Sequence, residues 1–155
     1  MIRIISIICL IFLNSCDYSP LYSSSQNSNF SISSLQITGD RDLSSYLQKG
    51  LSLYENQNNK NKYKIEINTS LSKEILVKDK SANTTDYKLI GTAKMIFIKY
   101  EVDETNKKSR EITFEEVINI KKETNNFEQT TYEYISKINL AEIILNKIIL
   151  FLNKN

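Results

Sequence analysis

The two cysteines are the only thiols of the sequence, and their positions limit the chemistry that they can do. Cys9 lies inside an apolar run that follows Arg3, and Cys16 comes just after that run. A positive end followed by about ten apolar residues is typical of a secretory signal, whereas a membrane-spanning helix needs roughly 20. A buried core helix is the alternative, but it would have nothing to pack against. We therefore expect residues 1–15 to be a signal peptide, which leaves one thiol and no disulfide framework.

The residues before Cys16 suggest what this single thiol does. Leu13-Asn14-Ser15-Cys16 resembles the bacterial lipoprotein box, which has an aliphatic residue three positions before the cysteine and a small residue directly before it. In that resemblance Cys16 becomes the first mature residue and carries acyl groups. Each buried methylene group contributes about 0.8 kcal/mol, and two or more chains give stable anchoring. Residues 16–29 are then the lipidated start and a flexible tether, because residues 23–29 are small and polar.

Other chemistry-bearing residues are scarce. The sequence has no histidine, the commonest general base and metal ligand, and its three glycines stand singly rather than in a phosphate-binding loop. Glu115 and Glu116 are adjacent on an expected strand, where neighbouring side chains point to opposite faces and cannot share a site. We expect a protein that is not an enzyme and that has no cofactor and no metal.

The basic residues gather in expected loops rather than on one helix. Removal of Arg3 with the signal leaves the 20 basic residues barely in excess of the 18 acidic ones, which argues against a nucleic-acid binder. Solvated turns are one interpretation of these clusters, and contact with an anionic lipid head group is the other. The clusters are Lys60, Lys62 and Lys64; Lys73, Lys78 and Lys80; Lys107, Lys108 and Arg110; and Lys121 and Lys122.

The first elements of the folded part are a strand and a helix. Phe30, Ile32, Leu35 and Ile37 alternate with polar residues, with one break in the alternation. A turn at residues 38–40 follows, with Asp40 as the expected N-cap of a helix. Apolar residues then recur at spacings of three and four, which predicts a helix over residues 41–55.

Three further runs have the period of two that is typical of half-buried strands. They cover residues 63–77, 87–102 and 112–120, and the first is expected to reach Val77 after a bulge. Because the second run gains Ile96 and Ile98 on its other face, we expect its second half to be buried on both sides or shifted in register. Short connections favour antiparallel pairing of the three strands.

Residues 126–152 place apolar side chains at helical spacing and predict a long amphipathic helix. Insertion of its last part into a membrane is one interpretation. Docking onto the sheet is favoured because Lys137, Glu142 and Lys147 interrupt the apolar run. The order β-α-β-β-β-α predicts an α+β two-layer sandwich, with a mostly antiparallel sheet of about four strands and both helices on one face. We expect residues 30–155 to form this single domain.

A resemblance to a known family adds to these interpretations. Cys16-Asp17-Tyr18-Ser19-Pro20-Leu21-Tyr22 resembles the Cys-Gly-Phe-x-Pro-Leu-Tyr start of mature alphaproteobacterial LptE, a family of lipopolysaccharide-assembly lipoproteins. Tyr87-Lys88-Leu89-Ile90-Gly91-Thr92-Ala93 also resembles a strand of that family, and the order of elements agrees over the rest of the chain.

The resemblance implies an outer-membrane, lipid-anchored protein that faces the periplasm. It would plug the lumen of the large β-barrel LptD in a 1:1 complex and help to insert lipopolysaccharide into the outer leaflet, without making or breaking a bond. On this basis we expect Tyr18, Pro20, Leu21 and Tyr22 to pack at the barrel or membrane rim. The expected lipopolysaccharide contacts are Lys78 and Lys80 in one loop, or Lys107, Lys108 and Arg110 in another.

Two other functions stay open on the sequence. One is an auxiliary lipoprotein of a lipid-transporting ABC system, which would have an ATPase complex as its partner. The other is a structural envelope lipoprotein with no role in transport.

Overall fold

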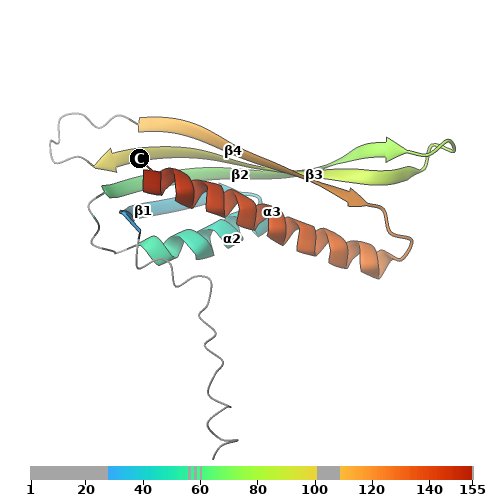
Figure 1. Ribbon diagram of the computed structural model, residues 1–155, viewed down its shortest axis with the longest axis horizontal. Coiled ribbons are helices and arrows are strands. Elements are labelled where there is room, and N and C mark those ends of the chain that lie inside the picture. Colours follow the sequence, from blue (N-terminus) through green and yellow to red (C-terminus); the bar gives the residue numbers. More distant parts are fainter. Residues whose placement is uncertain (1–27, 56, 58, 60, 101–108, 155) are drawn as a thin grey trace, which may run out of the picture.

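Four strands form one open sheet, and two helices cover one of its faces (Figure 1). The computed structural model describes residues 28–55, 57, 59, 61–100 and 109–154. The elements follow the expected order: strand β1 (Phe30–Gly39), helix α2 (Arg41–Leu51) with a short 3-10 helix η2 (Ser52–Tyr54), strands β2 (Asn61–Lys78), β3 (Thr84–Tyr100) and β4 (Ser109–Lys121), and helix α3 (Asn126–Lys154). The predicted α+β two-layer sandwich is confirmed.

The sheet is mixed, with spatial order β1-β2-β3-β4. β2, β3 and β4 pair antiparallel, as their short connections predict. β1 pairs parallel to β2, because α2 lies between the two strands in the chain and carries it back to the end of the sheet where β1 began. The expected antiparallel pairing of the last three strands is therefore confirmed, and β1 makes the sheet mixed.

The break in the alternation of the first strand is a β-bulge. Ile32 pairs with Tyr63 and Ser34 with Lys64, so Ser33 is the extra residue. Its hydroxyl donates a hydrogen bond to the Tyr63 carbonyl over 3.0 Å. The bulge turns Leu35 and Ile37 toward the helices after Phe30 and Ile32, so both halves of the strand contribute to the core.

Helix α2 begins where the sequence predicts. The backbone N–H of Leu43 donates to the Asp40 carboxylate over 3.0 Å, which confirms Asp40 as the N-cap. The α-helix ends at Leu51 rather than at residue 55, because the chain tightens into the 3-10 turn of η2. The apolar face continues through this turn, and Leu43, Leu47, Leu51 and Tyr54 are all buried.

The expectation for the second half of β3 is wrong. Its register with β2 and β4 has no break, and only its odd-numbered residues face the helices. Ile96 is 39% exposed on the opposite face, which no helix covers. That open face is otherwise mainly polar and carries the ion pairs Lys64–Glu66, Lys88–Glu74 and Lys94–Glu111.

Helix α3 docks on the sheet through its second half, as expected. Its residues are buried from Ser136 onward at helical spacing, and they include Leu140, Ile144, Ile148 and Leu152. At this end Phe97 and Phe151 meet edge to face with their ring centroids 5.2 Å apart. None of the helices that the structure describes has the length and apolar content needed to cross a membrane.

Candidate functional site

The β2–β3 hairpin projects beyond the layered body of the molecule (Figure 1). β1 pairs with β2 only as far as Thr69, and β4 pairs with β3 only as far as Asp86. The last residues of β2 and the first of β3 therefore have only each other as strand partners. Since β2 has 18 residues and a strand rises about 3.3 Å per residue, it is about 60 Å long, roughly twice the length over which β1 supports it.

Three consecutive apolar side chains near the hairpin tip are exposed to solvent. Ile75 is 55% exposed, Leu76 45% and Val77 46%. Ile75 pairs with Tyr87 and Val77 with Asp86, so Leu76 is an extra residue in a bulge. The expected bulge is present, but it lies after Ile75 rather than before it. Alternation along the strand places Ile75 on the helix side, and the bulge changes the direction of the residues that follow. The tip thus presents apolar groups in more than one direction.

The tip itself is a structured turn that carries the predicted lysines. The Asp79 carboxylate accepts hydrogen bonds from the backbone N–H groups of Ser81 and Asn83, both over 2.8 Å. The hydrogen bond from the Asn83 backbone is the main reason why the pKa of Asp79 lies below its ordinary value. Lys78 pairs with Thr84 across the hairpin, and Lys80 lies in the exposed turn.

The first turns of α3 brace the base of the hairpin. Lys73 of β2 forms an ion pair with Glu133 and lies over the Tyr87 ring, with its Nζ atom 4.0 Å from the centroid. Gln129 also donates to Glu133 over 2.6 Å. Burial raises the pKa of Glu133, but the hydrogen bonds from Lys73 and Gln129 and the charge of Lys73 outweigh it, so its pKa is lowered. The charge of Lys73 is therefore paired within the molecule, with Glu133 and the Tyr87 ring.

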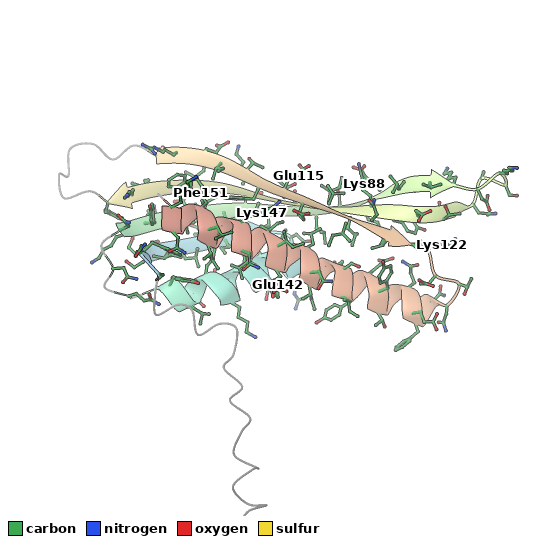
Figure 2. All side chains as sticks on the ribbon, in the orientation of Figure 1. Lys88, Glu115, Lys122, Glu142, Lys147 and Phe151 are labelled. Atoms are coloured by element: carbon green, nitrogen blue, oxygen red, sulfur yellow. The ribbon has the colours of Figure 1, made fainter. Side chains whose placement is uncertain are left out.

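Tertiary structure adds two lysines that we did not predict for this site. Lys121 pairs with Asp86 at the end of β4, and the backbone N–H of Lys122 donates to the Thr85 carbonyl over 2.8 Å. Figure 2 shows Lys122 at the end of β4, beside the projecting hairpin. Its charge also contributes to the lowered pKa of Asp79. The resulting cluster is Lys78, Lys80, Lys121 and Lys122 next to the exposed apolar run, which we call the hairpin site. The sequence signal for it was the order Ile-Leu-Val-Lys-Asp-Lys at residues 75–80.

The structure places Arg110 of the second predicted group of lipopolysaccharide contacts far from Lys78 and Lys80 of the first. Arg110 pairs with Phe97 at the opposite end of β3 from the hairpin tip. About 13 residues of strand, or roughly 43 Å, lie between these two places. Lys107 and Lys108 are outside the described residues, as are Cys16, Tyr18, Pro20, Leu21 and Tyr22.

The adjacent carboxylates of β4 point to opposite faces of the sheet, as predicted. Glu116 is on the helix face and forms an ion pair with Lys147 of α3. Lys147, which Figure 2 labels, also donates to the Glu115 carbonyl over 3.1 Å. The Glu115 side chain lies on the open face, opposite Thr92. Within the described ranges, no group of three or more histidine, cysteine or acidic residues is arranged to hold a metal ion.

Known proteins resemble this chain in fold rather than in sequence. No family model and no curated protein matches it. The solution structure of the uncharacterized lipoprotein B from Nitrosomonas europaea superimposes with a TM-score of 0.50 and 14% identity, over 79% of this chain and 83% of that chain. The rare lipoprotein B from Shewanella oneidensis gives a TM-score of 0.48 and 13% identity, over 74% of this chain and 92% of that one. The Nitrosomonas protein shows that this arrangement of strands and helices is shared.

Proposed function

We propose that this chain is a non-enzymatic lipoprotein of the lipopolysaccharide transport machinery. It is held at the outer membrane through Cys16, faces the periplasm, plugs the LptD barrel and helps to deliver lipopolysaccharide to the outer leaflet. The observation that carries the proposal is the hairpin site, where exposed apolar side chains lie next to a cluster of lysines. Lipopolysaccharide is itself an anionic amphiphile, so its phosphates would meet the lysines and its acyl region the apolar run.

The geometry of the hairpin favours the hairpin site as the lipopolysaccharide contact over the predicted group that includes Arg110. The hairpin projects from a body that the core holds together, so it can reach a ligand without any change in the packed layers (Figure 1). Four lysines gather there. Asp86 is the strand partner of Lys121, and Asp79 lies in the turn, where the charge of Lys122 acts on it.

The role as a plug is supported by the character of the open sheet face. This face is mainly polar, and it carries the ion pairs Lys64–Glu66, Lys88–Glu74 and Lys94–Glu111. The lumen of a large membrane barrel is also polar and wet. A polar face of this kind suits that environment better than it suits the interior of a lipid bilayer. The shared fold of the Nitrosomonas lipoprotein B supports a lipoprotein of this general kind.

The decisive experiment is affinity purification of the tagged full chain from the envelope of its own host, followed by identification of the proteins that come with it. We expect one large β-barrel protein in equal amount. A Cys16→Ala chain is the matched control, and it should recover less barrel because the anchor no longer keeps the two proteins together. Recovery of an ATPase complex instead would favour the ABC-associated alternative. Recovery of neither partner, with surface lipopolysaccharide unchanged on depletion of the chain, would contradict the proposal.

A further inference from the structure

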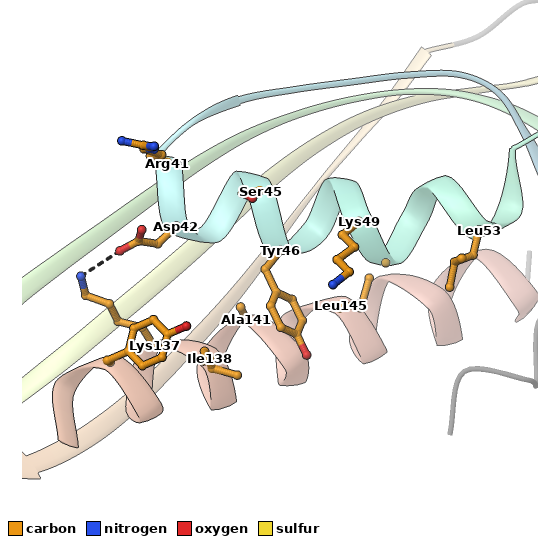
Figure 3. A pocket seen from close by; sticks show the side chains of 12 residues that line it. Arg41, Asp42, Ser45, Tyr46, Lys49, Leu53, Lys137, Ile138, Ala141 and Leu145 are labelled. Atoms are coloured by element: carbon orange, nitrogen blue, oxygen red, sulfur yellow. Dashed lines mark hydrogen bonds and ion pairs between the residues drawn. The ribbon is translucent and has the colours of Figure 1, made fainter. Parts of the chain in front are cut away.

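Helices α2 and α3 enclose a groove on the outer side of the helical layer, away from the sheet (Figure 3). Near one end of the groove, Asp42 of α2 forms an ion pair with Lys137 of α3. Eight residues further along each helix, Gly50 of α2 packs against Leu145 of α3. The two helices therefore run in the same direction and keep one register over about two turns. The groove between them has a volume of about 600 Å³, which is within the range of small-molecule sites.

The floor of the groove is apolar and fixed. Gly50, Ala141 and Leu145 are buried, and the helices approach so closely at Gly50 that a Cβ atom there would be 2.3 Å from Leu145 Cδ2. Leu53 at one end of the floor is 45% exposed, and Ile138 is half-buried. Gly50, Ala141 and Leu145 close the bottom of the groove. The apolar surface that solvent reaches comes mainly from Leu53 and Ile138 and from the rings of Tyr46 and Tyr134, which also line the groove.

The rim of the groove is cationic. Arg41, Ser45 and Lys49 recur every four residues and therefore lie in one row along α2. On the facing helix, Lys137 is paired with Asp42 across the groove over 3.0 Å (Figure 3). Arg41 and Lys49 form no ion pair within the part of the chain that the structure describes. Two cations without an ion-pair partner among the described residues and one hydroxyl thus lie on the α2 side of the groove.

We propose that this groove binds an anionic lipid, with one alkyl chain along the floor and the negative head group on the row Arg41, Ser45 and Lys49. Charge complementarity selects the occupant. A neutral apolar ligand would leave the two cations without a partner, and inorganic phosphate would leave the floor uncovered. This site is separate from the hairpin site and depends on neither the barrel nor the role in transport.

The proposal is tested by photolabelling of the full chain in phosphatidylcholine vesicles. The probe is dodecyl phosphate with a diazirine in its alkyl chain, and labelled peptides are identified by mass spectrometry. We expect the label on peptides that contain Leu53 and Ile138. Unlabelled dodecyl phosphate should displace the probe, whereas inorganic phosphate and dodecyl maltoside should not.

Two kinds of variant separate the floor from the rim. Leu53→Glu places a carboxylate in the groove and should lower labelling about tenfold, since an unpaired charge is costly next to apolar surface. Leu150→Glu is the matched control, because Leu150 is 69% exposed on α3 and does not line the groove. The double change Arg41→Glu and Lys49→Glu should also lower labelling, whereas Lys62→Glu on the open sheet face should not. All of these positions are exposed to solvent, so circular dichroism should show the fold unchanged.

Three results would overturn the proposal. The first is a label spread over the open sheet face, and the second is labelling that Leu53→Glu leaves at the level of Leu150→Glu. The third is a covalent dimer of the chain that carries the label, which would make the groove an interface between two copies.

Discussion

Gly91 of β3 lies directly beneath Leu140 of α3, so close that a Cβ atom on Gly91 would be 2.0 Å from Leu140 Cδ2. Both residues are buried, and Ile144 closes the same contact, 3.3 Å from that Cβ position. The second half of α3 therefore packs on a position of β3 that has no side chain, and a methyl group there would displace the end of Leu140.

We predict that Gly91→Ala destabilises the protein by about 1 to 3 kcal/mol, the usual cost of overpacking a filled core. Urea unfolding followed by circular dichroism measures this loss. Thr92→Ala is the matched control on the adjacent open face and should cost less. In a double-mutant cycle with Leu140→Ala, the two losses should be less than additive, because the shorter side chain makes room for the new methyl group. Additive losses would contradict the direct contact.

Gly39 is predicted to tolerate substitution even less well. Its φ of 108° lies in the region that favours glycine, and a Cβ atom there would be 1.9 Å from the backbone oxygen of Thr69. Backbone atoms of β2 cannot rotate away as a side chain can. Gly39→Ala should therefore cost about 3 kcal/mol or more of unfolding free energy.

The neighbouring N-cap residue, Asp40, provides a reference for the loss of stability expected from Gly39→Ala. Asp40→Ala removes only the hydrogen bond to the Leu43 N–H and should cost about 1 kcal/mol. Both variants are compared in the same urea titration. A smaller loss for Gly39→Ala than for Asp40→Ala would show that the turn is free to change its conformation.

The two ends of the sheet can be distinguished by charge reversal. We predict that Lys78→Glu combined with Lys80→Glu weakens binding to immobilised lipopolysaccharide about tenfold at low salt, because two attractions become repulsions. The Arg110→Glu chain is the comparison, since Arg110 lies at the far end of β3, and it should bind as the parent does. Added salt should reduce the difference between the chains, because the hairpin lysines are exposed. A larger loss for Arg110→Glu would move the contact to the other end.

Acid should loosen the brace between the hairpin and α3. The pKa of Glu133 lies below its ordinary value of 4.5 in the folded chain, so its ionised form is favoured by folding. Such a group contributes stability above its unfolded pKa and loses that contribution as the pH falls through the lower folded pKa. We therefore expect the stability advantage of the parent over Glu133→Gln to be complete at neutral pH and to shrink as the pH falls below about 4.5.

Urea unfolding at a series of pH values measures that difference. Asp79 also has a lowered pKa, but it is present in both chains and cancels in the comparison. A difference that stays constant down to the folded pKa of Glu133 would show that the carboxylate does not distinguish the folded from the unfolded state.

The strands and helices of this fold could be predicted from the sequence alone, because they depend on patterns of neighbouring residues. Period-two alternation specified the strands, the three-and-four spacing specified the helices, and Asp40 marked the start of α2. The bulge of β1 was also visible as a break in the alternation, because a side chain on the wrong face of a strand is detectable without any partner. These features depend on residues near one another in the chain.

Only the tertiary structure decided which distant residues meet. The parallel pairing of β1 with β2 and the solvent-facing side of Ile96 depend on where the helices lie, and alternation does not report this. In the same way, Lys121 and Lys122 join the hairpin lysines because β4 ends beside Asp86. Arg41 and Lys49 line the groove because α3 runs beside α2. Periodicity gives each element its faces, but long-range packing decides what each face meets.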